Sequence, residues 1–492
     1  MMLTAYAQAV APECLQLWVG LFDTETPPVA LGFELNEQPV VPEPIAAVRP
    51  IRDAMSGAGA KPLNHRGIFR ISNLEPARQY RVAITAGTER VTLLTRTLPS
   101  SVPQMLDGSF NILLCSCYYQ SEDASGLLGT IASQIRVRPD LTMMLGDQIY
   151  GDLPLFEDLP EDEAGVARKL GGKYRRNWAS LPLGIGGLGL VLGRAPVVCV
   201  ADDHEFWNNY PFRQTQLPKT WTDDGRKQWR EAALALYEDY QVSPTGAGAQ
   251  RIDVDPLKIL VVDMRCHRDE SFARLMLPET MRMIERWRSD LIDAKRNGQP
   301  AFGLLASGQA LFVTAADESK RRSVDAEMAN YTQFTDEILP ELDRLADEGI
   351  PVVYVTGDVH WGRVSQGIDL RRNRILLYEV ISSPSRLIRV PFADSAKETL
   401  NVAKGLFGKA DPWPRHSQSQ PVPDRFGSQR RFQLRCDLEH GDGVAQRGDQ
   451  IAIMSFSRAG GGINFSVSYY GITPDKALAQ SHTTPTYELR II

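Results

Sequence analysis

The chain has 492 residues, of which 43% are hydrophobic and 23% charged, and its formal net charge is −6. This balance is typical of a soluble globular protein, and the length exceeds that of one ordinary core, so we expect two domains or one large decorated domain. A net negative charge argues against general binding to nucleic acid or to an anionic membrane, although it leaves room for a local basic pocket that binds phosphate.

The first hundred residues predict an all-β module. Short strand candidates are separated by Pro, Gly and Asn turns at the spacing of a β-sandwich, and they lie at residues 16–22, 29–34, 67–71, 80–86 and 90–95. Residues 98–103 contain two prolines and two serines and read as a linker. We therefore predict two domains, residues 1–100 and 106–492, with an irregular β extension of the main domain as the alternative.

From Phe110 onward, apolar strand candidates alternate with helical patterns, which predicts the α/β fold class. Helices are expected at residues 125–137, 225–240, 278–295 and 330–348, and buried strands at 110–114, 141–145, 196–201, 258–262 and 351–356. Residues 411–429 are rich in Pro, Ser, Gln and Arg and predict a long loop. Antiparallel strands that complete a sheet edge are expected at 450–457, 462–469 and 484–491.

The five buried strands end in side chains that can bind metal or substrate. The residues that follow them include Cys117, Asp147, Tyr150, Asp202, Asp203, His204, Asp263, Arg265, Asp358 and His360. Parallel strands would bring these ends to one edge of a sheet, which is where open α/β proteins bind ligands. Carboxylate and imidazole together suit hard or borderline metal ions. For any single motif, a capped turn is the alternative.

A glycine-rich stretch at residues 184–189 fits the spacing of a dinucleotide-binding fingerprint, and Asp202 follows at about the expected distance. Its context argues against that function, because no convincing strand precedes it and we expect no helix between Gly189 and the next strand. Without a helix N-terminus, no pyrophosphate site forms. A mobile or packing loop is the interpretation we prefer.

The ordered motifs resemble those of one family. Gly-Asp-x-x-Tyr at 146–150, Asp-Asp-His-Glu at 202–205 and Gly-Asp-x-His at 357–360 resemble the PhoD-like (alkaline phosphatase D) branch of the calcineurin-like metallophosphoesterases, as do Ser116-Cys117 and Asp263-Met264-Arg265. The resemblance implies a layered αββα metallophosphoesterase sandwich over residues 106–492, preceded by a fibronectin III-like β domain. The stretch at residues 74–82, which contains Tyr80, is similar to the tyrosine corner of fibronectin III domains.

The same resemblance implies a centre of two metal ions. Its ligands would be Cys117, Asp147, Tyr150, Asp203, Asp358 and His360, with Asp147 as the bridge. Thiolate and phenolate donors favour iron and the oxygen-rich side suits calcium, with zinc or manganese as other candidates. A buried core thiol is the alternative for Cys117. Contacts outside the inner ligand set are expected from Asp152, Asp202 and Glu205.

The implied activity is hydrolysis of small-molecule phosphoesters, as a phosphomonoesterase or phosphodiesterase, with a metal-bound hydroxide attacking phosphorus in line. His204 matches the family's catalytic histidine and would protonate the leaving group, or else orient another residue. Arg265 would clamp phosphate oxygens, or else pair with Asp263. The alternatives are a non-catalytic protein that binds a phosphate ligand or serves as a scaffold on the same fold, and a hydrolase of another ester.

The sequence also predicts a cytoplasmic protein without an integral membrane segment. No apolar run reaches the roughly 20 residues that span a bilayer. Residues 1–13 lack a basic region, a long apolar run and a twin-arginine motif. The six cysteines are scattered and show no disulfide framework, which fits a reducing compartment.

Overall fold

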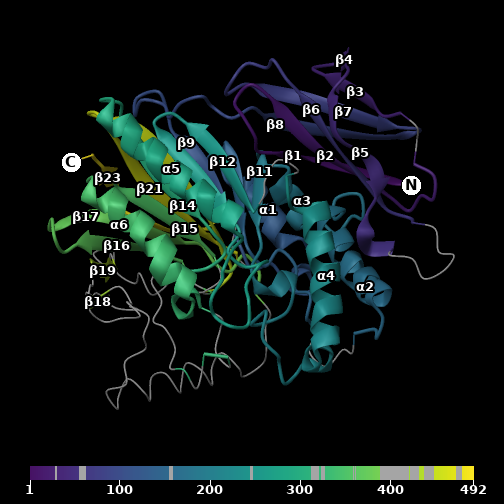
Figure 1. Cartoon of the computed structure of the whole chain (residues 1–492). Coiled ribbons are helices and arrows are strands. Elements are labelled where there is room, and N and C mark those ends of the chain that lie inside the picture. The colour runs from purple at the N-terminus through teal and green to yellow at the C-terminus, as the bar shows by residue number, and fades with distance from the viewer. Residues whose placement is uncertain are drawn as a thin grey trace.

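A computed structural model of the chain shows a mixed α/β fold built on two large sheets (Figure 1). The structure describes residues 1–27, 30–54, 62–154, 159–243, 248–311, 318, 321–322, 327–357, 360, 362–387, 420–421, 431–436, 448–472 and 479–491. Within these residues, no helix combines the length and the apolar character that a membrane span requires. The cytoplasmic location stays a prediction.

The first large sheet has 11 strands, in the order β22-β21-β20-β9-β10-β11-β1-β2-β6-β5, with β23 paired to β21. Its strands are β1 (Met2–Gln8), β2 (Leu15–Phe22), β5 (Glu43–Pro50), β6 (His65–Ile71), β9 (Phe110–Cys115), β10 (Leu141–Leu145), β11 (Val197–Val200), β20 (Gln450–Ala459), β21 (Gly462–Gly471), β22 (Ala479–Thr483) and β23 (Tyr487–Leu489). Strands β9, β10 and β11 run parallel, so their carboxyl ends share one edge.

The second large sheet has eight strands, in the order β12-β13-β14-β15-β17-β16-β19-β18. Its strands are β12 (Ala249–Val254), β13 (Leu257–Val262), β14 (Phe302–Ala306), β15 (Val352–Thr356), β16 (Arg363–Asp369), β17 (Arg374–Ile381), β18 (Gln420–Pro421) and β19 (Phe432–Cys436). All five predicted buried strands are confirmed, but our expectation of a single sheet edge is wrong. Three of them lie in the first sheet and two in the second, because strands that are apolar on both faces carry no signal of their pairing partner.

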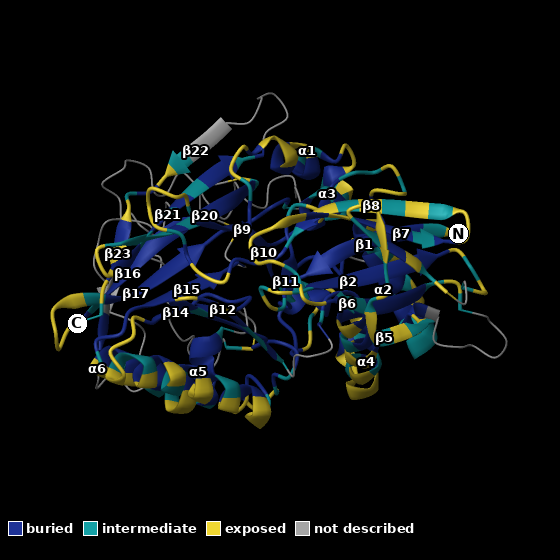
Figure 2. Cartoon of the chain, turned by 90° about the horizontal axis from the view of Figure 1, so that it is seen from above, coloured by how far each residue is buried: buried dark blue, intermediate teal, exposed yellow. Residues whose placement is uncertain are grey.

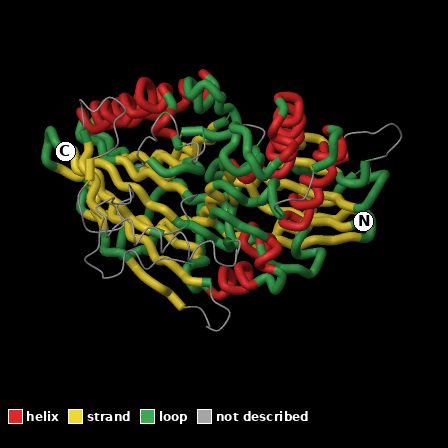
Figure 3. The backbone as a smooth tube through the Cα atoms, turned by 90° about the horizontal axis from the view of Figure 1, so that it is seen from below, coloured by secondary structure: helices red, strands yellow, loops and turns green. Residues whose placement is uncertain are grey.

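The two sheets pack face to face, and alternate residues of each strand point to different cores. On β9, Ile112 and Leu114 face the second sheet, whereas Leu113 faces the helices. The outer side of the first sheet is covered by α1 (Leu127–Gln134), α2 (Glu163–Trp178), α3 (Leu188–Leu192) and α4 (Asp223–Tyr240). The outer side of the second is covered by α5 (Pro278–Arg296) and α6 (Leu339–Asp347). Figure 3 shows the strands running between these helices, and Figure 2 shows α5 exposed on its outer face only.

The N-terminal module is a sandwich of strands, as predicted. A four-stranded sheet of β3 (Gly32–Leu35), β4 (Gln38–Val40), β7 (Gln79–Ala86) and β8 (Glu89–Arg96) shares a core with β1 and β2. The Tyr80 hydroxyl accepts the backbone N–H of Glu75 at 3.0 Å, the contact of a tyrosine corner. However, β1 also pairs with β11, so one sheet continues from the module into the rest of the chain. Two statements therefore stay predictions: the division into domains at residues 1–100 and 106–492, and the likeness to fibronectin III.

The predicted helices are all present, with different bounds, and the last begins as one turn of π-helix at Phe334–Ile338. Our expectation that no helix follows the glycine-rich stretch is wrong, because the short helix α3 lies there. Gly187 has φ 69°, and a Cβ on it would lie 2.4 Å from the Tyr118 hydroxyl. This glycine therefore packs the chain tightly where no other residue fits. Of the predicted loop at 411–429, the structure describes only Gln420–Pro421, which form the short strand β18, and the rest lies outside the described residues.

Candidate metal centre

The carboxyl ends of β10 and β11 meet through a close backbone approach. Gly146 has φ 93°, and a Cβ there would lie 2.6 Å from Cβ of Asp202. The next residue, Asp147, also adopts a positive φ of 58°. The two positive φ values turn the chain sharply at the strand end. Glycine adopts such a φ freely, whereas at Asp147 it is the kind of backbone strain that is often part of a functional site.

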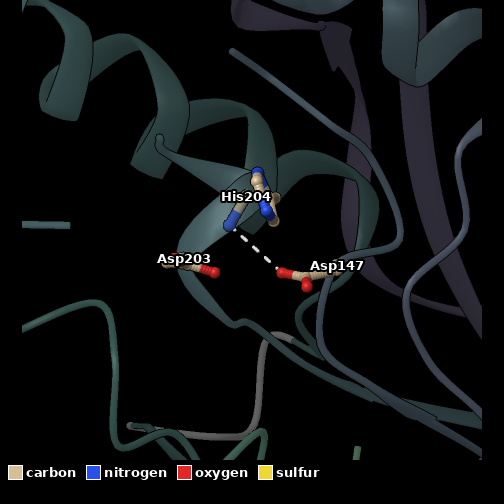
Figure 4. A group of neighbouring side chains, drawn as sticks. All are labelled: Asp147, Asp203 and His204. Atoms are coloured by element: carbon tan, nitrogen blue, oxygen red, sulfur yellow. Dashed lines mark hydrogen bonds between the residues drawn. The ribbon is translucent and has the colours of Figure 1, made fainter. Parts of the chain in front are cut away.

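Three side chains at this point form a compact group of potential metal ligands (Figure 4). Asp147, Asp203 and His204 each offer one ligand atom, and these atoms all lie within 4.8 Å of one another. The backbone N–H of His204 donates to Asp147 Oδ1 at 3.1 Å, the dashed line in Figure 4. Asp203 Oδ2 accepts the backbone N–H of Asn209 at 2.6 Å. Both carboxylates are buried. The backbone hydrogen bonds hold them in place.

A thiol and a phenol lie next to this group. Cys117, two residues after the end of β9, is fully buried, and its sulfur lies 3.4 Å from Asp147 Oδ2. The Tyr150 ring packs against His204 in a tilted arrangement, with 4.1 Å between the ring centroids and 32° between the ring planes. Among the described residues, the buried Tyr150 hydroxyl has no hydrogen-bond partner. Burial raises the pKa of this phenol well above its ordinary value, and Cys117 and Asp147 raise it further.

The end of β15 in the second sheet reaches the same place. A Cβ on Gly357 would lie 2.4 Å from Cβ of Ser116 and 2.5 Å from the carbonyl oxygen of Leu145. This glycine therefore lets β15 end against β9 and β10. Of the two predicted ligands beyond it, Asp358 lies outside the described residues. His360 is exposed, with φ 58°, and its imidazole does not belong to the compact group that the described residues form.

His204 is oriented by a carboxylate from the loop after β10. Asp152 Oδ1 lies 2.7 Å from His204 Nδ1, and Asp152 Oδ2 accepts the backbone N–H of Asn208 at 3.0 Å. Burial opposes a charged imidazole, yet Asp152, Asp203 and Asp147 raise the pKa of His204 well above its usual value. Likewise, burial opposes the Asp152 carboxylate, but His204 holds its pKa below the usual range. Both shifts favour the charged forms of the two side chains.

Arg265 is buried beneath the ligand group. Its Nε donates to Asp202 Oδ1 at 2.6 Å, one terminal nitrogen donates to the Tyr210 carbonyl at 3.0 Å, and the other lies 4.0 Å from Asp203 Oδ1. Asp263 instead accepts the backbone N–H of Arg265 at 2.8 Å. The guanidinium thus pairs with Asp202, a partner that the sequence analysis did not consider. Direct contact with phosphate stays a prediction.

Comparison with known proteins identifies the family. The sequence model of the PhoD-like phosphatases matches residues 110–386, more than half of the chain. This chain belongs to the PhoD-like phosphatase family. The match covers every residue of the ligand group and the pairs that orient it, and phosphatases of this family depend on metal ions.

The PhoD-like fold extends over nearly the whole chain. A solved structure, "Structure of PhoD", aligns with 99% of this chain and 92% of its own at a TM-score of 0.58 and 14% identity, which shows a shared fold. The structure "GAP50 the anchor in the inner membrane complex of Plasmodium" aligns with 78% of this chain and 90% of its own at 10% identity, but its TM-score of 0.35 carries no argument. A search of curated proteins found no match to the sequence.

In this PhoD-like phosphatase, Glu205 organises the site and was undervalued by the sequence analysis. Its carboxylate accepts the backbone N–H groups of Asp147, Gln148 and Asp202 at 2.8–2.9 Å and the amide of Gln241 at 3.2 Å. Burial raises the pKa of Glu205 to about 7. The spacing of Asp202 and Glu205 is that of a capping box, which was the available sequence signal.

The donor set of this PhoD-like phosphatase fits metal ions. Burial raises the pKa of Asp147 well above its usual value, His204 acts against this effect and nearby Asp203 adds to it, so further positive charge would favour the ionised carboxylates. A bound cation would supply it. The Tyr150 hydroxyl, which has no hydrogen-bond partner within the described part of the chain, and the Cys117 thiol provide further donors beside the two carboxylates.

Proposed function

We propose that the protein is a metal-dependent phosphoester hydrolase, a phosphomonoesterase or phosphodiesterase of the alkaline phosphatase D type. Its substrate would be a small-molecule phosphoester. The observation that carries the proposal is the compact group of Asp147, Asp203 and His204 at the joined strand ends of a PhoD-like chain. The two packed sheets with helices on both outer sides support the αββα metallophosphoesterase sandwich as the fold.

Two metal ions would be held by Cys117, Asp147, Tyr150 and Asp203, together with Asp358 and His360, and Asp147 would bridge them. Thiolate and phenolate donors favour iron at one position, and carboxylate oxygens favour calcium at the other, with zinc or manganese as substitutes. When bound, such ions lower the pKa of water and neutralise charge on phosphoryl oxygens.

Residues of the protein itself would then have separate roles. Asp152 fixes the His204 ring through Nδ1, so Nε2 is the nitrogen able to give a proton to the leaving oxygen. Arg265 holds Asp202 and lies near Asp203, which supports a positioning role in addition to the proposed clamp on phosphate. Glu205 ties the turn after β10 to the turn after β11 and so keeps the two carboxylates at a fixed separation.

The direct test measures hydrolysis of aryl phosphates, aryl phosphodiesters and aryl carboxyl esters on one preparation whose metal content is known. We expect turnover of at least one phosphoester and its loss when a chelator removes the metal. Turnover of carboxyl esters alone would support the other hydrolase class. Phosphate binding without any turnover would support the non-catalytic alternative.

A further inference from the structure

A cavity of about 340 Å³ lies beside the candidate centre. Tyr150 lines it, and the Tyr150 ring also lies in a tilted contact with His204, so one residue borders both the cavity and the ligand group. Tyr119, which also lines the cavity, packs edge-on against Tyr150 with 5.6 Å between the ring centroids. A volume of this size is at the small end of ligand pockets and suits a short substituent. The cavity and the ligand group are therefore neighbours, with Tyr150 in contact with both.

The cavity wall is basic. Lys169, Lys173 and Arg176 of α2 all line it, and their spacing of four and three residues places them on one face of the helix. Among the described residues that line it, none is an Asp or a Glu. In a chain with a net charge of −6, this local excess of cations is a property of the cavity and not of the surface as a whole.

The three cations have different surroundings. Lys173 Nζ donates to the carbonyl oxygens of Tyr150, Gly151 and Leu153, so it fixes the loop that carries Tyr150 and Asp152. Arg176 is exposed, and within the described residues no carboxylate forms an ion pair with it. Arg176 is therefore the cation best placed to meet an incoming anion.

We propose that this cavity binds a second anionic group, located in the leaving group of the substrate, so that the preferred substrate is a phosphoester whose alcohol part carries its own phosphate-like or carboxylate charge. The inference rests on the proposed phosphoester hydrolysis and adds the substrate class. The reacting phosphoryl group would occupy the Asp147–Asp203–His204 group, and the second anion would meet the cations of α2 beyond Tyr150. Charge-assisted hydrogen bonds from Arg and Lys are the contacts that such an anion receives.

The test compares two substrates with one scissile bond each, propyl phosphate and 3-phosphonopropyl phosphate. We expect the wild type to prefer the second by about tenfold in kcat/KM, which corresponds to one charge-assisted hydrogen bond. Arg176→Ala should abolish most of this preference through KM and leave propyl phosphate within about twofold. Arg176→Lys should restore part of it. Arg168→Ala is the matched control, since Arg168 is exposed on the same helix and does not line the cavity.

A carboxylate version, 3-carboxypropyl phosphate, distinguishes the two kinds of anion. A preference equal to that of the phosphonate indicates recognition of charge, and a smaller one indicates a site shaped for a phosphate-like group. Equal kcat/KM for propyl phosphate and both charged substrates would overturn the inference. The inference would also be overturned if Arg176→Ala and Arg168→Ala had the same effect on the preference for the charged substrates.

Binding of non-hydrolysable ligands separates this inference from the proposed function. Calorimetry should show propane-1,3-bisphosphonate binding more tightly than propylphosphonate to the wild type, with the difference lost in Arg176→Ala. If the protein hydrolyses no phosphoester but retains this Arg176-dependent difference, the proposed activity fails and the anion site stands. If it hydrolyses propyl phosphate but shows no such difference, the activity stands and the anion site fails.

Discussion

Asp152 fixes the imidazole of His204, with 2.7 Å between Asp152 Oδ1 and His204 Nδ1. The pKa of Asp152 is held below its usual range, chiefly by His204 acting against the effect of burial, so the carboxylate is ionised and only accepts hydrogen bonds. The proton of this contact therefore lies on Nδ1, and Nε2 is left for other partners. The contact settles the ring orientation but leaves open whether Nε2 serves a leaving group or a metal ion.

His204→Ala separates these two roles. A nitrophenolate leaves readily, whereas an alkoxide needs a proton in the transition state. If His204 is the acid, kcat/KM for an alkyl phosphate should fall by about 10²–10⁴, with a much smaller loss for nitrophenyl phosphate and unchanged metal content. Asp152→Asn should show the same pattern in weaker form, because it disturbs the tautomer. Equal losses on both substrates, together with a loss of metal, would instead make His204 a ligand.

Asp147→Asn should remove the metal ions. An amide offers one acceptor oxygen and no negative charge, so it cannot bridge two cations. Elemental analysis of the wild type purified without chelators should find at least two metal ions per chain. The variant should lose both together while circular dichroism stays unchanged. Asp253→Asn, at an exposed strand position, is the control. Full activity of the wild type with less than one equivalent of metal would contradict the two-metal proposal.

Cys117→Ser should lower both metal content and activity. The sulfur of Cys117 lies 3.4 Å from Asp147 Oδ2 and 3.2 Å from the Ser383 hydroxyl, and serine keeps the polar contact while losing a soft thiolate donor. If iron is bound, its thiolate-dependent colour should disappear. Cys14→Ser, away from the centre, should retain the wild-type properties. Accumulation of a phosphorylated Cys117 during turnover would indicate a covalent mechanism instead.

Glu205→Gln should damage the site although it changes no proposed metal ligand. The Glu205 carboxylate accepts backbone N–H groups from both strand-end turns. An amide in its place would direct its own N–H groups at one of these backbone donors. Each buried donor left without a partner costs about 1–3 kcal/mol. We expect a lower free energy of unfolding in urea and reduced kcat. Glu231→Gln on α4 is the surface control, and a Glu205→Gln variant identical to it would rule out the organising role.

Asp239 should give the protein a specific acid sensitivity. This buried carboxylate on α4 pairs with Arg49 and Arg66 of the N-terminal module and with the neighbouring Arg52. Burial opposes its charge, but Arg52 and Arg49 hold the pKa of Asp239 below its usual value.

A carboxyl group with a depressed folded-state pKa stabilises the protein fully above its unfolded pKa of about 3.9 and loses this contribution as pH falls through the folded value. Asp239→Asn should therefore lower the free energy of unfolding by about 3 kcal/mol at pH 7, as expected for breaking a buried ion pair. The difference from the wild type should shrink below about pH 4. A difference that is independent of pH down to pH 2 would contradict this assignment.

The sequence by itself determined the buried strands, the order of the motifs and the chemical types of the candidate ligands. Short apolar runs that end in Gly-Asp or Asp-Asp-His-Glu indicate strand ends with functional side chains, and the strands at residues 141–145 and 351–356 lie close to where they were predicted. These features are local, because they depend on hydrophobicity and turn chemistry within a few residues.

Only the tertiary structure decided which strands share a sheet and which side chains meet. Helix α2 was missed because it contains Gly171 and Gly172, and glycine weakens a helix by about 1 kcal/mol each. Its formation depends on long-range packing, since a Cβ on Gly171 would lie 2.2 Å from Cβ of Asp53. The pairs of Asp152 with His204 and of Arg265 with Asp202 join residues far apart in the chain. Such contacts arise when two sheets and their helices close on one another, and no local pattern encodes them.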